Sequence, residues 1–95
     1  MAVIIGLLTA EIFIPSANSL KEKRMVVKGL KDKIHNKFNV SVSEVDYQDK
    51  WQRALLGIAQ VGNDYGFIEK NLNKIFNLIE SNNNVEIIDH SFEYL

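Results

Sequence analysis

Residues 2–14 form a long run of β-branched and apolar side chains that ends at Pro15. This composition favours a β-strand, and proline ends the strand because it cannot donate a hydrogen bond to a sheet. With a period of two, one face of the strand is apolar from end to end, whereas the other is apolar in its first half, at Val3, Ile5 and Leu7, and then carries Thr9 and Glu11 before Phe13. We therefore expect a central strand whose second face is at least partly covered.

A helix is expected to follow. Ser19 and Glu22 have the spacing of a capping box, in which a hydroxyl and a carboxylate bind amide groups left unpaired at a helix start. The apolar side chains after them share one side of a helical wheel. They are Leu20, Val27, Leu30, Ile34 and Phe38. This side should pack on the sheet, and the helix should end near Asn39, a residue that tolerates a left-handed backbone.

The rest of the chain predicts three more strands and a second helix. Residues 40–45 alternate as a half-buried strand does, and residues 51–61 form an apolar strand after a polar connection. Residues 64–81 have apolar side chains at helical spacing, and residues 85–95 supply the last strand. The order β-α-β-β-α-β predicts one α+β domain over residues 1–95 with a ferredoxin-like fold. In that fold both helices lie on one face of an antiparallel four-stranded sheet.

Two helices cover only one face of such a sheet. The apolar half of the other face, at Val3, Ile5 and Leu7, would be exposed in a monomer. Because contiguous exposed apolar patches mark interfaces, we expect a homo-oligomer, with a dimer favoured, formed through this open face or a strand edge. The alternative is that Phe92, Tyr94 or the connection between the second and third strands folds over the face and shields it.

Charge is segregated along the chain. Residues 20–38 hold seven of the eleven Lys and Arg against two of the twelve acids, a net charge of +5 in a chain whose total is −1. Five side chains of this segment fall within about 80° of arc on a helical wheel, beside the apolar side. They are Lys21, Arg24, Lys28, Lys31 and His35, the basic stripe. Only Asp32, four residues after Lys28, is placed to relieve their mutual repulsion.

A cationic stripe on a rigid helix suits contacts to phosphates, so we interpret it as a surface for RNA or for a ribosomal particle. The alternatives are a different anionic partner, or a solvated face neutralised by acids from elsewhere. Residues 53–60 lack the aromatic side chains on which an RNA-recognition motif stacks bases. We therefore do not expect specific reading of single-stranded RNA, nor reading of DNA sequence.

A second cluster lies between the second and third strands. It consists of Gln48, Asp49, Trp51, Gln52 and Arg53. Trp and Arg are enriched at the energetic centres of interfaces, so these side chains suit a polar ligand pocket, a partner site or an oligomer interface. The structural alternative is that Asp49 pairs with Arg53 while Trp51 packs over a sheet edge.

Several classes of chemistry find no support. The chain has no cysteine, which excludes disulfides and thiolate metal sites and suits a reducing cytoplasm. His35 and His90 are isolated in the sequence, so no metal site is expected. No serine stands in a nucleophile motif, and Gly62–Gly66 does not have the spacing of a phosphate-binding loop. We expect no cofactor and no catalytic residues.

The apolar N-terminus does not predict a membrane protein. Residues 1–8 lack the preceding cations and the cleavage site of a signal peptide. Glu11 ends the apolar run well before the roughly 20 residues that span a bilayer. We therefore expect a cytoplasmic domain that does not contact a membrane.

Three segments resemble the bacterial YlxP-like family, and the similarity runs over essentially the whole chain. They are Ser19–Arg24, Phe38–Val45 and Gln48–Ala54, the last with the pattern Gln-Asp-x-Trp-Gln-Arg-Ala. The resemblance implies a ferredoxin-like fold and a cytoplasmic bacterial protein of unknown function, often encoded near translation and ribosome-maturation factors. It implies no activity, substrate or catalytic residue.

These observations predict a non-catalytic accessory module that binds RNA or the ribosome through its basic stripe. The alternative function is a homo-oligomeric module that binds a protein or small ligand through the open sheet face and the region of Trp51 and Arg53.

Overall fold

The computed structural model describes residues 2–95, so Met1, the first residue of the predicted domain and of the apolar N-terminus, lies outside the described residues. The elements follow the predicted order with boundaries that differ by one to two residues. They are β1 (Ile4–Phe13), α1 (Leu20–Lys37), β2 (Ser41–Asp46), β3 (Arg53–Gly62), α2 (Tyr65–Glu80) and β4 (Glu86–Tyr94).

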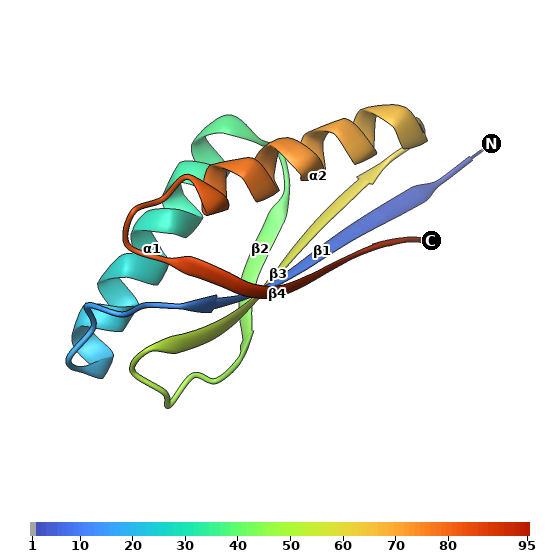
Figure 1. Ribbon diagram of the computed structural model, residues 1–95. Helices are drawn as coiled ribbons and strands as arrows, with labels where there is room; N and C mark the ends of the chain where they lie inside the picture. The colour runs from blue at the N-terminus through green and yellow to red at the C-terminus, as the bar shows by residue number, and fades with distance from the viewer. Residues whose placement is uncertain (1) are drawn as a thin grey trace.

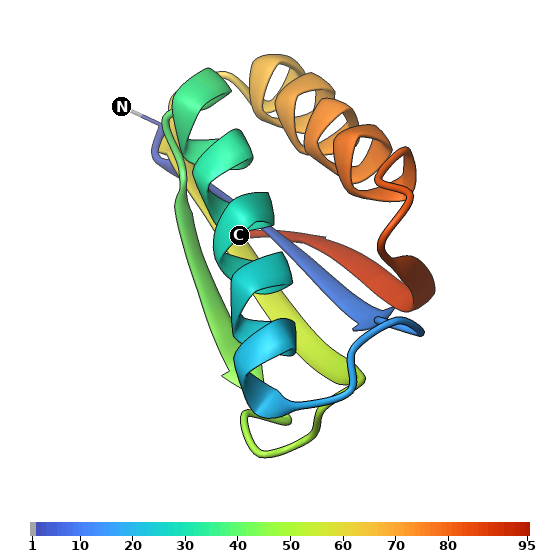
Figure 2. The same ribbon diagram turned by 90° about the vertical axis from the view of Figure 1, so that its left-hand side faces the viewer.

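The four strands form one antiparallel sheet in the order β2-β3-β1-β4. Strand β1 pairs along its whole length with β3 and for most of it with β4, so the predicted central strand is confirmed. Strands β2 and β4 are the two edges. Figures 1 and 2 show both helices on the same face of the twisted sheet, and the predicted ferredoxin-like α+β fold is confirmed.

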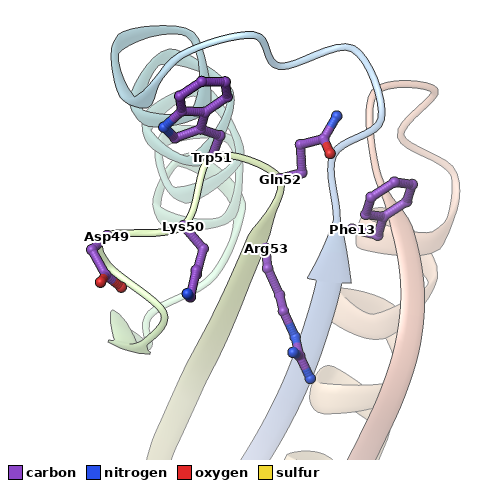
Figure 3. A pocket seen from close by; sticks show the side chains of 6 residues that line it. All are labelled: Phe13, Asp49, Lys50, Trp51, Gln52 and Arg53. Atoms are coloured by element: carbon purple, nitrogen blue, oxygen red, sulfur yellow. The ribbon is translucent and has the colours of Figure 1, made fainter.

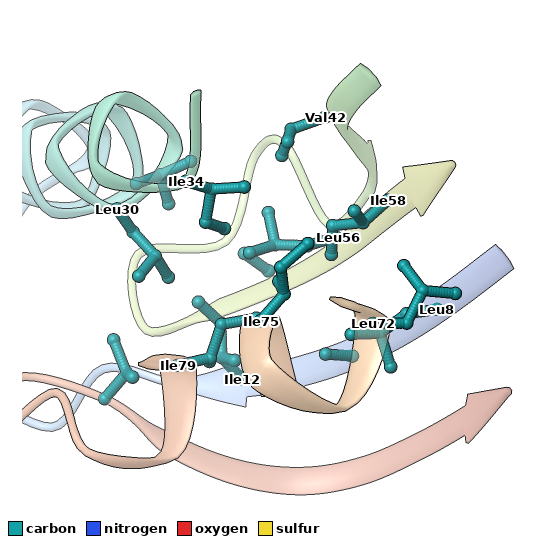
Figure 4. Close-up of a cluster of buried hydrophobic side chains, with 14 of the residues drawn as sticks. Leu8, Ile12, Leu30, Ile34, Val42, Leu56, Ile58, Leu72, Ile75 and Ile79 are labelled. Atoms are coloured by element: carbon teal, nitrogen blue, oxygen red, sulfur yellow. The ribbon is translucent and has the colours of Figure 1, made fainter. Parts of the chain in front are cut away.

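The core lies between the helices and the helix-facing side of the sheet (Figure 4). Even-numbered residues of β1 point into it, as the period of two predicted, and the apolar sides of both helices cover them. The largest of its fully buried apolar side chains include Leu8, Ile12, Leu30, Ile34, Leu56, Ile58, Leu72, Ile75 and Ile79. Leu20 and Phe38, which the helical wheel placed on the core side, are only half-buried, as is Phe76 of α2.

Side-chain caps determine where the helices begin. Ser19 Oγ accepts a hydrogen bond from the Glu22 amide at 3.1 Å, as the capping box predicted. The carboxylate of Glu22 accepts from the Asn18 amide at 3.4 Å, one residue before the expected donor. Asp64 Oδ1 accepts from the Phe67 amide at 3.2 Å and caps α2 in the same way. Both helices thus start with the satisfied amides that stabilise a helix terminus.

Helix α2 approaches β1 most closely at Gly6. A Cβ atom at this position would lie 2.5 Å from Ile68 Cγ2 and 2.8 Å from Leu72 Cδ1, both in fully buried side chains. Any larger residue would have to displace them, so glycine lets the first half of α2 rest on the sheet.

The face of the sheet opposite the helices is open. Val3 and Ile5 are 59% and 38% exposed, and Leu7 is half-buried. The alternative in which Phe92 and Tyr94 shield this face is wrong, because both residues pack on its helix-covered side. There the Phe92 ring lies 5.9 Å from Phe76, and the Tyr94 ring lies 4.8 Å from Tyr65. No helix within residues 2–95 is long and apolar enough to cross a membrane.

Candidate nucleic-acid interface

Figure 2 shows one flank of α1 next to the edge strand β2. The basic stripe belongs to this flank, because His35 lines a hollow with Ser41 of β2, whereas Val26 and Lys33 on the opposite flank line a hollow with Asn82, which follows α2. Lys21, Arg24, Lys28 and His35 are exposed, and Lys31 is half-buried at the border with the core. His35, in the last turn of the helix, lines a surface hollow together with residues of β2 and β3, including Ser41 and Ala59. The stripe therefore follows one edge of the molecule rather than the middle of the helix layer.

Asp32 relieves part of the repulsion within the stripe. Lys28 Nζ lies 3.0 Å from Asp32 Oδ2, four residues away on the helix. Both side chains are mostly exposed, at 78% and 56%, so solvent screens the pair and its contribution to stability is small.

Lys23 was counted among the cations of the segment, but it does not belong to its surface. Its side chain is only 1% exposed, and Nζ lies 2.6 Å from Glu44 Oε2 and donates to the Tyr47 carbonyl at 2.6 Å. The outer surface of residues 20–38 thus carries six Lys and Arg against two acids. The sequence holds a signal for this burial, because Lys23 shares the helical spacing of Val27, Leu30 and Ile34.

The opposite edge of the sheet carries the opposite charge. Strand β4 exposes the acids Glu86, Asp89 and Glu93. Its one basic side chain is His90. The basic flank of α1 therefore lies over one edge of the sheet and β4 forms the other, acidic edge, although the edge strand β2 itself carries Glu44 and Asp46 and no cation.

The loop between β2 and β3 is held at both ends. Tyr47 has a left-handed backbone with φ of 63°, and its carbonyl accepts from both Lys23 Nζ and the Lys50 amide, the latter at 3.0 Å. At the other end, Gln52 Nε2 donates to the Pro15 carbonyl at 3.0 Å, and the Gln52 carbonyl accepts from the Ile14 amide at 2.8 Å. These bonds hold the loop against the segment that leads into α1.

Arg53 is held by a pair that crosses to the neighbouring strand. Its Nε donates to Glu11 Oε2, and its guanidinium lies 4.2 Å from the centre of the Tyr47 ring. The hydrogen bond to Glu11 raises the pKa of Arg53 above its ordinary value, so the side chain stays charged. The alternative in which Asp49 pairs with Arg53 is wrong.

Four of the five residues of the second cluster line one pocket of about 460 Å³ (Figure 3). They are Asp49, Trp51, Gln52 and Arg53, joined by Phe13 and Lys50. Gln48 does not line it, because its Nε2 points to the Glu44 carbonyl at 3.4 Å. Phe13 is not among the predicted site residues, since only the pairing of β1 with β3 brings it opposite Arg53. Trp51 is 55% exposed, so it is not buried against a sheet edge as the structural alternative predicted.

No group of three or more His, Asp or Glu side chains within residues 2–95 is arranged to hold a metal ion.

The fold and the charged edge define a small ferredoxin-like α+β domain with a rigid cationic flank. The chain belongs to the DUF503 family, described as proteins of unknown function, whose family model matches residues 5–92. It is 47% identical over 77 residues to the uncharacterized protein YlxP of Bacillus subtilis (strain 168), an alignment that covers 81% of this chain and 84% of YlxP. The resemblance found in the sequence is thereby confirmed.

The designed protein Foldit4 has the same fold. It superposes with a TM-score of 0.57 over 98% of this chain and 96% of its own, at 12% sequence identity. At this identity the similarity concerns the fold alone.

Proposed function

We propose that this protein is a cytoplasmic, non-catalytic module that binds RNA, alone or in a ribosomal particle, through the basic stripe. Lys21, Arg24, Lys28 and Lys31 contact phosphates, and His35 extends the stripe toward β2. The observation that carries the proposal is the placement of these five side chains along one flank of a capped helix.

The geometry of α1 favours an extended polyanion over a small anion. Lys21 and Lys31 are ten residues apart, which corresponds to about 15 Å along a helix. A single phosphate reaches one or two of these cations, whereas a nucleic-acid strand presents phosphates along the whole length. The acidic edge at β4 repels the same strand, so binding is directed to the α1 flank.

Contacts of this kind read the phosphate backbone and carry no sequence information. Their contribution to affinity comes from the release of counterions, which makes binding strongly dependent on salt. The proposed module therefore recognises the presence and the path of a strand rather than its sequence.

Co-sedimentation with purified ribosomal particles tests this function. We expect the protein to pellet with the particles at about 50 mM salt and to be largely released at about 200 mM. The Lys70→Glu/Lys74→Glu variant, altered at two exposed lysines of α2, should behave like the parent. Absence of binding at the lower salt, or binding that salt does not change, would contradict the proposal.

A second candidate function is self-association through the open sheet face, which one observation favours. Exposed apolar side chains gather at the end of the face where β1 begins and where β3 and β4 end. They are Val3, Ile5, Val61 and Leu95. Ile5 pairs with Val61 in the sheet and exchanges two backbone hydrogen bonds with Leu95, so the patch is continuous. A patch of this kind fits a homodimer.

Gel filtration with light scattering tests the dimer. We expect a mass near twice that of the chain, and a shift to the monomer mass in the Ile5→Lys variant, because a charge at the centre of an apolar interface is costly to bury. A parent protein that stays a monodisperse monomer at high concentration rules out this second function.

A further inference from the structure

Trp51 lies at the end of the molecule where the basic stripe begins. The contact of Lys23 Nζ with the Tyr47 carbonyl places the start of the loop against the first turn of α1. The bond from Gln52 Nε2 to the Pro15 carbonyl places its end against the segment that enters α1. Figures 1 and 2 show the β2–β3 loop and the start of α1 at the same end of the protein. Lys21 stands in this first turn, and Arg24 follows it at the start of the second.

An exposed indole at this position needs an explanation. Trp51 keeps 55% of its surface exposed, although hydrophobic contact would favour its burial. The hydrogen bonds at Tyr47 and Gln52 hold the loop that carries it, so the ring is offered on an ordered support. A rigid, exposed aromatic ring that borders a pocket is the usual arrangement of a stacking platform.

The charges around Trp51 fit a nucleotide. Lys50 and Arg53 line the same pocket and supply two cations for a phosphate against one acid, Asp49, while Phe13 adds a second aromatic side chain (Figure 3). Arg53 binds Glu11 through Nε, and its two terminal nitrogens have no hydrogen bond within residues 2–95. The pocket volume of about 460 Å³ lies in the range of small-ligand sites and is large enough for a base.

We infer that Trp51 stacks on an unpaired base of the RNA strand whose phosphates lie along the basic stripe. This inference rests on the proposed function and adds that the bound RNA is single-stranded where it passes the β2–β3 loop. Stacking on an aromatic ring tolerates every base, because each has a π-face. The site therefore separates single strands from duplexes without reading a sequence, which agrees with the lack of aromatic side chains on β3.

Fluorescence measures this contact directly, because Trp51 is the one tryptophan of the chain. We expect an oligo(U) strand of about 20 nucleotides to quench the emission of Trp51 as it binds. A blunt RNA duplex with the same number of phosphates should bind through the stripe and leave the emission nearly unchanged. The Lys28→Glu/Lys31→Glu variant should need more oligo(U) and reach the same quenching at saturation.

Affinity measured by anisotropy of labelled oligo(U) gives the second readout. Trp51→Ala should weaken binding of the single strand about 10-fold, and Trp51→Phe should keep most of the affinity because it keeps an aromatic face. Phe67→Ala is the matched control, since Phe67 is similarly exposed, at 58%, but lies on α2. All three substitutions are at exposed positions and should leave the far-ultraviolet circular dichroism spectrum unchanged.

The outcomes separate the two proposals. Binding of oligo(U) without quenching, and with equal affinity for the parent and Trp51→Ala, overturns the stacking contact and leaves the phosphate contacts standing. Failure of the parent to bind either RNA at low salt overturns both. Equal quenching by the duplex and the single strand also overturns the inference, because a paired base cannot reach the indole.

Discussion

Replacing Lys23 by alanine should lower the free energy of unfolding by about 3 kcal/mol, although the substitution lies in a segment rich in solvated lysines. The side chain is fully buried, and its loss leaves the Glu44 carboxylate without its charge partner and the Tyr47 carbonyl with the Lys50 amide as its remaining donor. We expect the lower end of the range for broken buried ion pairs because the Glu44 side chain keeps 17% exposure. Urea unfolding followed by circular dichroism measures the change.

Further variants test whether the loss of stability comes from the buried ion pair. Lys28→Ala removes one member of the exposed pair with Asp32 and should change the free energy of unfolding by no more than about 0.5 kcal/mol. Replacing both members of the pair, in Lys23→Met/Glu44→Leu, should recover much of the stability lost in Lys23→Met alone, since an apolar pair leaves no charge unpaired. A Lys23→Ala protein as stable as the parent contradicts this account.

Reversing two charges of the stripe should have the largest effect on binding. We expect the Lys28→Glu/Lys31→Glu variant to bind oligo(U) about 10- to 100-fold more weakly at low salt, since two phosphate contacts are lost and two repulsions added. The fold should be retained, because Lys28 is exposed and Lys31 is only half-buried. Titration by anisotropy measures the loss.

The Lys70→Glu/Lys74→Glu variant has the same change in net charge on α2, away from the stripe. If it loses as much affinity as the stripe variant, overall charge governs binding, and α1 has no special role.

Most of the fold could be predicted because its signals are local. The alternation in residues 2–14, the capping box at Ser19 and the helical spacing of Ile68, Leu72 and Ile75 each specify an element within a few residues of sequence. The order of these elements then leaves few topologies. The open face followed from the same argument, since two helices cannot cover both sides of a sheet.

The partners of charged side chains could not be predicted in this way. Arg53 stands four residues from Asp49 but pairs with Glu11, which is 42 positions away and lies on the next strand. Lys23 finds its partners in β2 and in the loop that follows. Such choices depend on the register of strands and on the twist of the sheet, which no spacing along the chain encodes.

The candidate site could be predicted only where its residues are close together in the sequence. The basic stripe lies on one helix, so its spacing was enough to place Lys21, Arg24 and Lys28 on one flank. The pocket beside Trp51 also needs Phe13, which comes from another strand, and the sequence alone did not show that the loop lies next to the start of the stripe.

The dependence of binding on salt tests the central claim most directly. If the four cations Lys21, Arg24, Lys28 and Lys31 each meet a phosphate, the logarithm of the association constant for oligo(U) should fall with the logarithm of salt concentration with a slope of about −3. The Lys28→Glu/Lys31→Glu variant should halve it, to about −1.5. Equal slopes for the two proteins, or a slope near zero for the parent, would contradict the assignment of the basic stripe as an RNA-binding surface.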